Sequence, residues 1–197
     1  MLVRRRLLAA GLLLPFAAQA SAALLSQLRG GWLNMFFRAS LTGRANPAGW
    51  QGDPKCAVQR NLTDAGRQAA QDLGAAIREL GIPIGDVLSS PFCRCVDTAT
   101  LAFGRASVVA WLEADGVFTA PLERARLAAL AYVFRAAPRG GNRMLFGDDH
   151  NLYGLHEVYD WPDLLPIAEG ECRILRPAES PEVLGRVAHD GWRGLAA

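Results

Sequence analysis

Two segments of this 197-residue chain end on an arginine, and these arginines are the residues best suited to carry chemistry. Residues 32–38 form an apolar run that ends on Arg38, and residues 88–94 repeat the pattern with Arg94. An arginine at the end of a buried strand presents a planar guanidinium, which can bind an oxyanion through two parallel hydrogen bonds. Two such arginines on neighbouring strands would form an anion-binding site.

Four segments carry a family resemblance. Residues 36–40 read Phe-Phe-Arg-Ala-Ser, residues 59–66 read Gln-Arg-Asn-Leu-Thr-Asp-Ala-Gly, residues 81–94 end in Leu-Ser-Ser-Pro-Phe-Cys-Arg, and residues 147–152 read Gly-Asp-Asp-His-Asn-Leu. Their order and spacing, across residues 31–155, resemble those of exported bacterial-type members of the histidine phosphatase (phosphoglycerate mutase-like) superfamily. The resemblance implies an α/β fold, a three-layer sandwich whose largely parallel central sheet is flanked by helices.

The resemblance assigns a role to four positions. In this family a histidine after the first arginine attacks phosphorus, while two arginines and a second histidine neutralise the transferred group. Arg38 and Arg94 match the phosphate-binding arginines. Ala39 occupies the position of the nucleophile, and its methyl group cannot accept a phosphoryl group. Asp148 occupies the position of the second histidine and should repel a phosphate dianion unless it is protonated or paired. Both catalytic histidines are therefore missing, and we do not expect the standard phosphohistidine mechanism.

The histidines of the chain offer at most a partial substitute. His150 lies two positions beyond the expected second histidine, and a local loop rearrangement could direct it into the site. The alternative is a histidine that faces solvent or caps a helix. His156 and His189 are expected at the surface, because a lone titratable residue needs a partner before it indicates function.

Several other polar residues have two possible roles. Asp97 lies three residues after Arg94, on the same helical face, and could orient that arginine or serve as an ordinary helix carboxylate. Arg60 either contributes to the anion pocket or holds its own loop. Asp53, Asp148 and Asp149 are further candidate acids, and the sequence does not choose among them.

The hydrophobic pattern places these residues at the ends of elements. It predicts strands over 32–37, 86–89, 107–112 and 143–146, helices over 63–80, 90–104 and 119–136, a short helix after the segment 147–152, and a closing hairpin at 172–175 and 183–188. The alternation of strand and helix predicts a largely parallel sheet covered on both faces. Ligands of such sheets gather beyond the carboxyl ends of the strands, where Arg38, Arg94 and Asp148 all fall.

The first 22 residues predict a signal peptide, followed by a single domain over 23–197. Three arginines at positions 4–6 precede an apolar segment at 7–16, and small residues at 18–22 suit a cleavage site. We therefore expect export to the periplasm, with an uncleaved N-terminal anchor and twin-arginine export as open alternatives. This segment holds three of the 21 basic residues and none of the 19 acidic ones, so its removal lowers the formal charge from +2 to −1. No nucleic-acid partner is expected, and no membrane contact beyond the export signal.

The four cysteines are Cys56, Cys93, Cys95 and Cys172. An even number of cysteines in an exported chain makes disulfides plausible, and three pairings of four cysteines are possible. We prefer a Cys56–Cys93 bridge, which would tie the long loop over residues 40–61 to the second arginine. The cysteines lack the C-x-x-C or cysteine–histidine spacing of a metal site, so neither a metal nor another cofactor is expected.

These features favour a catalytically impaired histidine-phosphatase-fold protein that keeps an arginine-lined pocket for a phosphorylated or other anionic small molecule. Two alternatives stay open. One is an active phosphomonoesterase, a phosphoric monoester hydrolase that uses water or a displaced residue such as His150 as the nucleophile. The other is a degenerate domain that serves as a structural or interaction surface.

Overall fold

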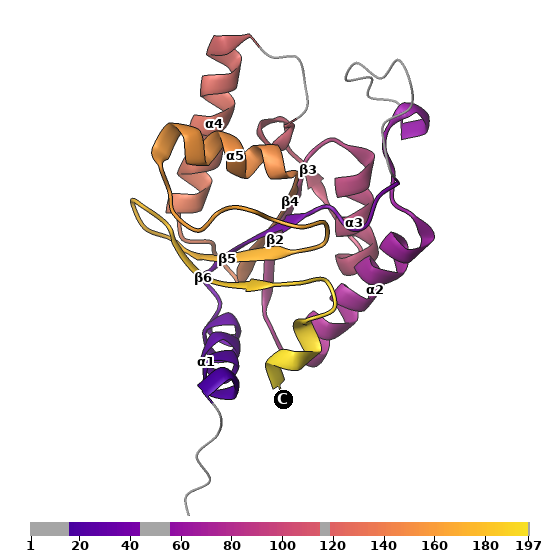
Figure 1. Cartoon of the computed structure of the whole chain (residues 1–197), viewed down its shortest axis with the longest axis vertical. Coiled ribbons are helices and arrows are strands. Elements are labelled where there is room, and N and C mark those ends of the chain that lie inside the picture. Colours follow the sequence, from indigo (N-terminus) through magenta and orange to yellow (C-terminus); the bar gives the residue numbers. More distant parts are fainter. Residues whose placement is uncertain (1–15, 44–55, 115–118, 197) are drawn as a thin grey trace, which may run out of the picture.

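The central sheet of the computed structural model has a parallel core and an antiparallel edge (Figure 1). The structure describes residues 16–43, 56–114 and 119–196. Within these ranges, six strands pair in the order β3-β2-β4-β1-β5-β6. Their bounds are β1 Asn34–Arg38, β2 Ile84–Ser89, β3 Ser107–Val108, β4 Asn142–Gly147, β5 Cys172–Arg176 and β6 Glu182–Val187. The first four strands in this order run parallel, and β5 and β6 add the predicted hairpin in the antiparallel sense.

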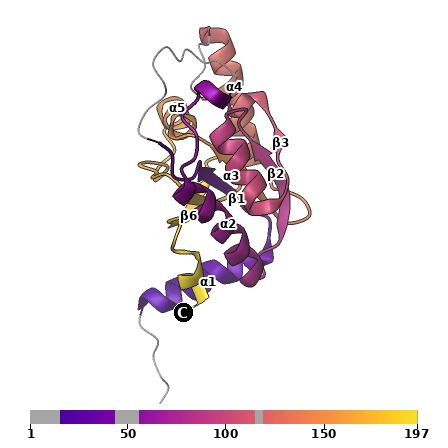
Figure 2. The same cartoon turned by 90° about the vertical axis from the view of Figure 1, so that its right-hand side faces the viewer.

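Helices cover both faces of the sheet, which confirms the predicted α/β architecture (Figures 1 and 2). The α-helices are α1 Phe16–Gly30, α2 Asp64–Glu79, α3 Cys93–Phe103, α4 Ala120–Arg135 and α5 Asp149–Tyr159, and the short 3-10 helices are η1 Cys56–Val58, η2 Ala110–Leu112 and η3 Trp192–Ala196. The pair α2 and α3 packs on one face, while α4, α5 and η2 pack on the other. Thr63 caps α2 by accepting a hydrogen bond from the Gly66 amide at 3.0 Å, as the sequence predicts.

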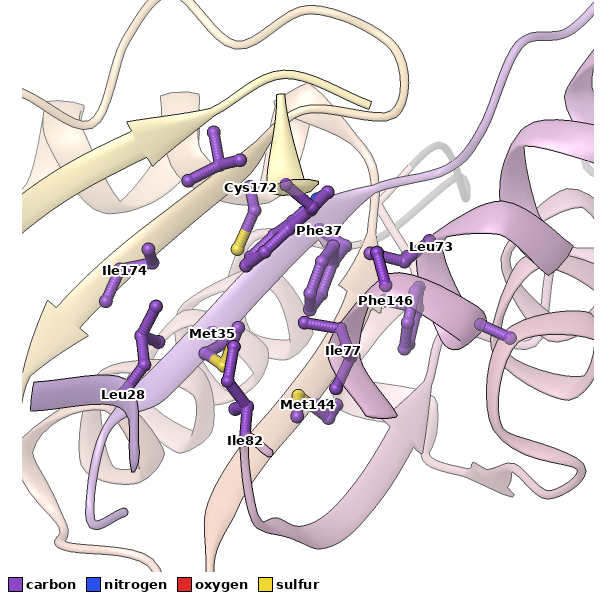
Figure 3. Packing of buried hydrophobic residues seen from close by; sticks show 14 of the residues in the cluster. Leu28, Met35, Phe37, Leu73, Ile77, Ile82, Met144, Phe146, Cys172 and Ile174 are labelled. Atoms are coloured by element: carbon purple, nitrogen blue, oxygen red, sulfur yellow. The ribbon is translucent and has the colours of Figure 1, made fainter. Parts of the chain in front are cut away.

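The side chains of β1 divide the core into two clusters. Met35 and Phe37 face α2 and α3, whereas Phe36 faces α4 and packs edge-on against Phe134 at 6.0 Å between ring centroids. This alternation follows from the two-residue period of a strand. Figure 3 shows the first cluster, in which the rings of Phe37 and Phe146 stack at 4.9 Å. The buried strands hold the sheet end rigidly, so the residues that follow β1 and β4 have defined positions.

Three predicted elements differ from the structure, and one of them is α5, which begins at Asp149 instead of after residue 152. The strand predicted over 107–112 is reduced to β3 and then η2, because Leu112 turns inward and is completely buried in the second cluster while Val108 stays exposed at the sheet edge. Helix α3 begins at Cys93 rather than at Ser90. The Ser90 amide still donates to the Phe146 carbonyl at 2.8 Å, which extends the sheet pairing by one residue and delays the helix.

Helix α1 contains the predicted cleavage positions and packs on the domain through the half that follows them. Leu25 and Leu28 are buried in the first core cluster, and the Arg29 side chain donates to the Leu80 carbonyl at 2.8 Å. Gln27 bonds Arg176 of β5 at 3.0 Å. Figure 1 shows α1 beside the C-terminal turn. Among the described residues, no helix has the length and apolar character needed to cross a membrane.

The close approach of α2 and α3 depends on Gly74. A Cβ atom at this position would lie 1.9 Å from the Ala102 carbonyl oxygen of α3, far inside van der Waals contact. Glycine therefore lets the backbone of α2 pack directly against the last turn of α3.

Replacing Gly74 by alanine is expected to lower the free energy of unfolding by about 1–3 kcal/mol, because the added methyl group overlaps the Ala102 carbonyl. Urea denaturation followed by circular dichroism measures the change. Gly30→Ala is the matched control, since its Cβ would meet no atom within 4 Å, and it should stay within about 0.5 kcal/mol of the parent. Equal stability of the two variants would contradict the close approach.

Candidate functional site

Arg38 stands at the carboxyl end of the sheet, as its position in the sequence predicts. It is the last residue of β1 and pairs with Gly147 of β4. Its Nη1 donates to the Ile167 carbonyl at 2.8 Å, and its Nη2 lies 3.2 Å from the Asp149 carboxylate. The Arg38 side chain is 18% exposed and that of Asp149 is 24% exposed. Arg38 therefore forms an ion pair that solvent still reaches.

Arg94 lies much deeper. Its side chain is 1% exposed and makes a bidentate ion pair with Asp148. The Nε–Oδ1 distance is 2.8 Å and the Nη2–Oδ2 distance is 2.9 Å. The guanidinium also lies over the Phe92 ring, 4.4 Å from its centroid. Asp148 follows β4 and is held by the Asn151 side chain, which accepts a hydrogen bond from the Asp148 amide at 2.8 Å. The charge that the sequence places at the second-histidine position is therefore paired with Arg94.

Arg60 meets a third carboxylate, which comes from the segment between α5 and β5. Its Nη1 lies 3.4 Å from Oε1 of Glu169. The same carboxylate accepts hydrogen bonds from the Thr42 amide at 3.1 Å and from the Thr42 hydroxyl at 2.5 Å. Sequence reasoning did not single out Glu169 or Thr42, because the contact depends on how residues 160–171 fold back across the end of β1.

All three arginines considered from the sequence thus contact a carboxylate, and the three pairs differ in accessibility. The Arg94–Asp148 pair is buried, whereas the Arg38–Asp149 and Arg60–Glu169 pairs keep about a fifth or a quarter of each side chain exposed. Breaking a buried pair is strongly unfavourable, because it leaves an uncompensated charge away from water. A partly exposed pair contributes little to the free energy of folding. Of these three arginines, Arg38 and Arg60 are therefore the accessible ones.

Ala39 is enclosed beside these pairs. It is 2% exposed, its amide donates to the Gly147 carbonyl at 3.0 Å, and its carbonyl accepts from the Gly170 amide at 2.9 Å. A small cavity of about 10 Å³ borders the chain on both sides of it and is lined in part by Arg38, Ser40 and His189. That volume is at the lower limit for one water molecule.

The histidines take different positions around the site. The His150 side chain is 65% exposed and its Nδ1 lies 3.1 Å from the Asp149 carboxylate. The same carboxylate pairs with Arg38, so Asp149 lies between the two residues. His156 bonds the Trp161 carbonyl at 3.1 Å. His189, expected at the surface, is half-buried and lines the small cavity beside Ala39. Its position follows from the turn after β6, a long-range arrangement that local sequence patterns do not encode.

The remaining acidic candidates lie away from the paired arginines or outside the described part of the chain. Asp97 pairs with Arg67 of α2 at 3.0 Å, and the partner that orients Arg94 is Asp148 rather than Asp97. Asp97 and Arg94 lie on the same helix, but the Asp97 carboxylate pairs with the Arg67 guanidinium of α2. Asp53 lies outside the described residues.

The cysteines join one loop to the start of α3. Cys56 and Cys93 form a disulfide with a Cα–Cα distance of 5.6 Å, which is the pairing preferred from the sequence. Gln59 reinforces this connection, because its side-chain oxygen accepts from the Cys93 amide at 2.9 Å. The disulfide therefore holds the loop against the helix that carries Arg94.

Cys95 is a free thiol close to the buried ion pair. Its sulfur lies 3.7 Å from the Asp148 carboxylate. Burial, and then the negative charge of Asp148, raise the pKa of Cys95 well above its ordinary value. The residue therefore stays a neutral thiol at physiological pH and does not supply the thiolate that nucleophilic attack requires. Within the described ranges, no cluster of three or more histidine, cysteine, aspartate or glutamate side chains could hold a metal ion.

The Arg94–Asp148 pair is expected to contribute more to stability than the Arg38–Asp149 pair. Asp148→Asn leaves the buried Arg94 guanidinium without a counter-charge and should lower the free energy of unfolding by about 3–5 kcal/mol. Asp149→Asn removes the same charge from a partly exposed pair and should cost at most about 1 kcal/mol. Urea denaturation of both variants measures the difference, and similar small losses would contradict the structural role of Asp148.

Comparisons with known proteins relate the chain to phosphatases. A model of the histidine phosphatase superfamily (branch 1) matches residues 45–115. This match includes residues 59–66 and 81–94, whereas the segments that hold Ala39 and Asp148 lie outside it. No curated protein matches the sequence.

Solved structures resemble nearly the whole described fold. The protein histidine phosphatase SixA in complex with tungstate aligns with a TM-score of 0.54 and 16% identity, over 80% of this chain and 97% of that one. The putative phosphohistidine phosphatase SixA from Agrobacterium tumefaciens gives 0.52 and 18%, over 80% and 99%. The ecdysone phosphate phosphatase EPPase from Bombix mori, also with tungstate, gives 0.53 and 15%, over 78% and 92%. The chain has the phosphoglycerate mutase-like fold that these phosphatases share.

Proposed function

We propose that this chain is an exported, catalytically impaired member of the histidine phosphatase superfamily that binds a phosphorylated or other anionic small molecule. The resemblance in residues 59–66 and 81–94, the match over residues 45–115 and the shared fold support the family. In our proposal the ligand contacts Arg38. Arg94 has a structural role, because its buried pair with Asp148 supports the site.

The exposure of the Arg38–Asp149 pair is the observation that carries the binding proposal. Arg38 stands at the carboxyl end of the sheet, where ligands of such folds bind. One of its nitrogens is fixed by the Ile167 carbonyl, and the other faces a carboxylate that is 24% exposed. An ion pair open to solvent is worth only about 0–1 kcal/mol. A phosphate group can therefore compete with Asp149 for the guanidinium.

The surroundings of Ala39 support impaired catalysis. The methyl group cannot form a phosphoryl intermediate. Cys95 is held as a neutral thiol beside Asp148. His150 is largely exposed and bonded to Asp149, so its geometry gives no specific support to an active phosphomonoesterase.

The proposal divides the chain into a signal peptide over 1–22 and a single domain over 23–197. Leu25 and Leu28 of α1 are buried against the domain, so cleavage after residue 20 or 22 keeps both of these packed residues. The Cys56–Cys93 disulfide supports an oxidising compartment such as the periplasm.

Arg38→Gln is expected to weaken the binding of inorganic phosphate about tenfold, because it removes the charge-assisted hydrogen bonds of the guanidinium. Isothermal titration calorimetry on the purified chain measures the affinity. Arg176→Gln is the matched control, since Arg176 is exposed on β5 and pairs with Glu182 and Gln27. Phosphate affinity that is unchanged in Arg38→Gln would contradict the proposed site.

The chain is expected to show no hydrolysis of an aryl phosphate above background, because Ala39 cannot act as nucleophile. The double variant Ala39→His/Asp148→His replaces both missing histidines and frees Arg94 from its carboxylate, so it should gain measurable turnover. Release of the coloured aryl alcohol gives the rate, and circular dichroism checks the fold. Turnover by the parent chain that disappears in His150→Ala would instead establish an active phosphomonoesterase with a displaced histidine.

A further inference from the structure

The carboxylate of Glu169 is bound as a ligand would be. It accepts hydrogen bonds from the backbone amide and the hydroxyl of Thr42, and it forms an ion pair with the guanidinium of Arg60. A backbone amide, a hydroxyl and an arginine are the donors with which proteins commonly bind phosphate oxygens. Thr42 and Arg60 thus form an arrangement of donors for an oxyanion, and a side chain of the protein itself occupies it.

The Glu169 side chain can leave this position without moving the backbone around it. The Gly170 amide is tied to the Ala39 carbonyl at 2.9 Å, and the Ile167 carbonyl is tied to Arg38 at 2.8 Å. Further along, the Ala168 amide donates to Glu171 at 2.7 Å. These bonds hold the segment on both sides of Glu169. A rotation about the side-chain bonds is therefore enough to withdraw the carboxylate.

The Arg60–Glu169 pair is also accessible to an incoming anion. Both side chains are 25% exposed, in contrast to the buried Arg94–Asp148 pair. A tethered carboxylate competes with free ligand at an effective concentration on the order of millimolar. It would therefore reduce affinity for a ligand without abolishing binding.

We propose that Thr42 and Arg60 form a second oxyanion subsite, normally occupied by Glu169, and that a phosphoryl group of the ligand enters it by replacing the Glu169 carboxylate. The inference rests on the proposed function, because it extends the anion site of Arg38 along the same segment. A phosphoryl dianion carries more charge than the carboxylate that it replaces, so it gains more from the Arg60 guanidinium.

Glu169→Gln tests the subsite. The variant removes the competing charge and keeps the size of the side chain, so inorganic phosphate should bind about tenfold more tightly than to the parent chain in isothermal titration calorimetry. Glu179→Gln is the matched control. The Glu179 side chain is 90% exposed and pairs with Arg135 instead of with Thr42 or Arg60. It should leave phosphate affinity unchanged. Thr42→Val in the Glu169→Gln background should remove the gain, because the hydroxyl donor is lost.

A nuclear magnetic resonance readout locates the effect. The Thr42 amide signal should shift in Glu169→Gln, and phosphate should shift it further in both the parent and the variant. If the parent binds phosphate and Glu169→Gln binds it no more tightly, the subsite is overturned while the proposed function stands. If Thr42→Val/Glu169→Gln keeps the gain, the effect is long-range charge and the subsite is likewise overturned. If none of the proteins binds phosphate, the proposed function fails, and the subsite fails with it.

Discussion

The buried ion pair between Arg94 and Asp148 is the interaction on which the site depends. It joins the start of α3, which follows β2, to the start of α5, which follows β4, at the point where these parallel neighbours end. An arginine that is 1% exposed needs an anion at close range, since an isolated buried charge is too costly. The carboxylate of Asp148, a residue of the same chain, supplies that anion.

This pairing changes which groups can meet a ligand. With Arg94 neutralised, Arg38 and Arg60 are the accessible members of the three arginines, and each lies beside a partly exposed carboxylate. The segment 160–171 connects them, because its Ile167 carbonyl holds one arginine and its Glu169 carboxylate meets the other. In the proposed function, a ligand therefore meets these two pairs rather than Arg94.

Local sequence pattern predicts the parts of this arrangement that depend on periodicity. The apolar run before Arg38 and the capped helix after Thr63 place β1 and α2 correctly, since strand alternation and helix capping act over a few residues. Pairing between distant segments is less accessible. The contacts of Glu169 with Thr42 and Arg60 join residues more than a hundred positions apart, and no short motif encodes them. Asp148 lies between these cases: its placement was predictable, but its partner became clear only from the packing of α3.

The pairing also explains why Ala39 and Asp148 belong to one change rather than two. A histidine at position 148 would leave Arg94 unneutralised in a buried setting, so the fold would then depend on a bound anion to supply the missing charge. Asp148 removes that dependence, and in doing so removes the cation that a reacting phosphate beside residue 39 would need. Under the proposed loss of catalysis, a nucleophile at position 39 would keep Arg38 but lack the charge of Arg94 to stabilise a transferring phosphate. Alanine at that position, enclosed between Gly147 and Gly170, then loses nothing further and fills the space that the core leaves.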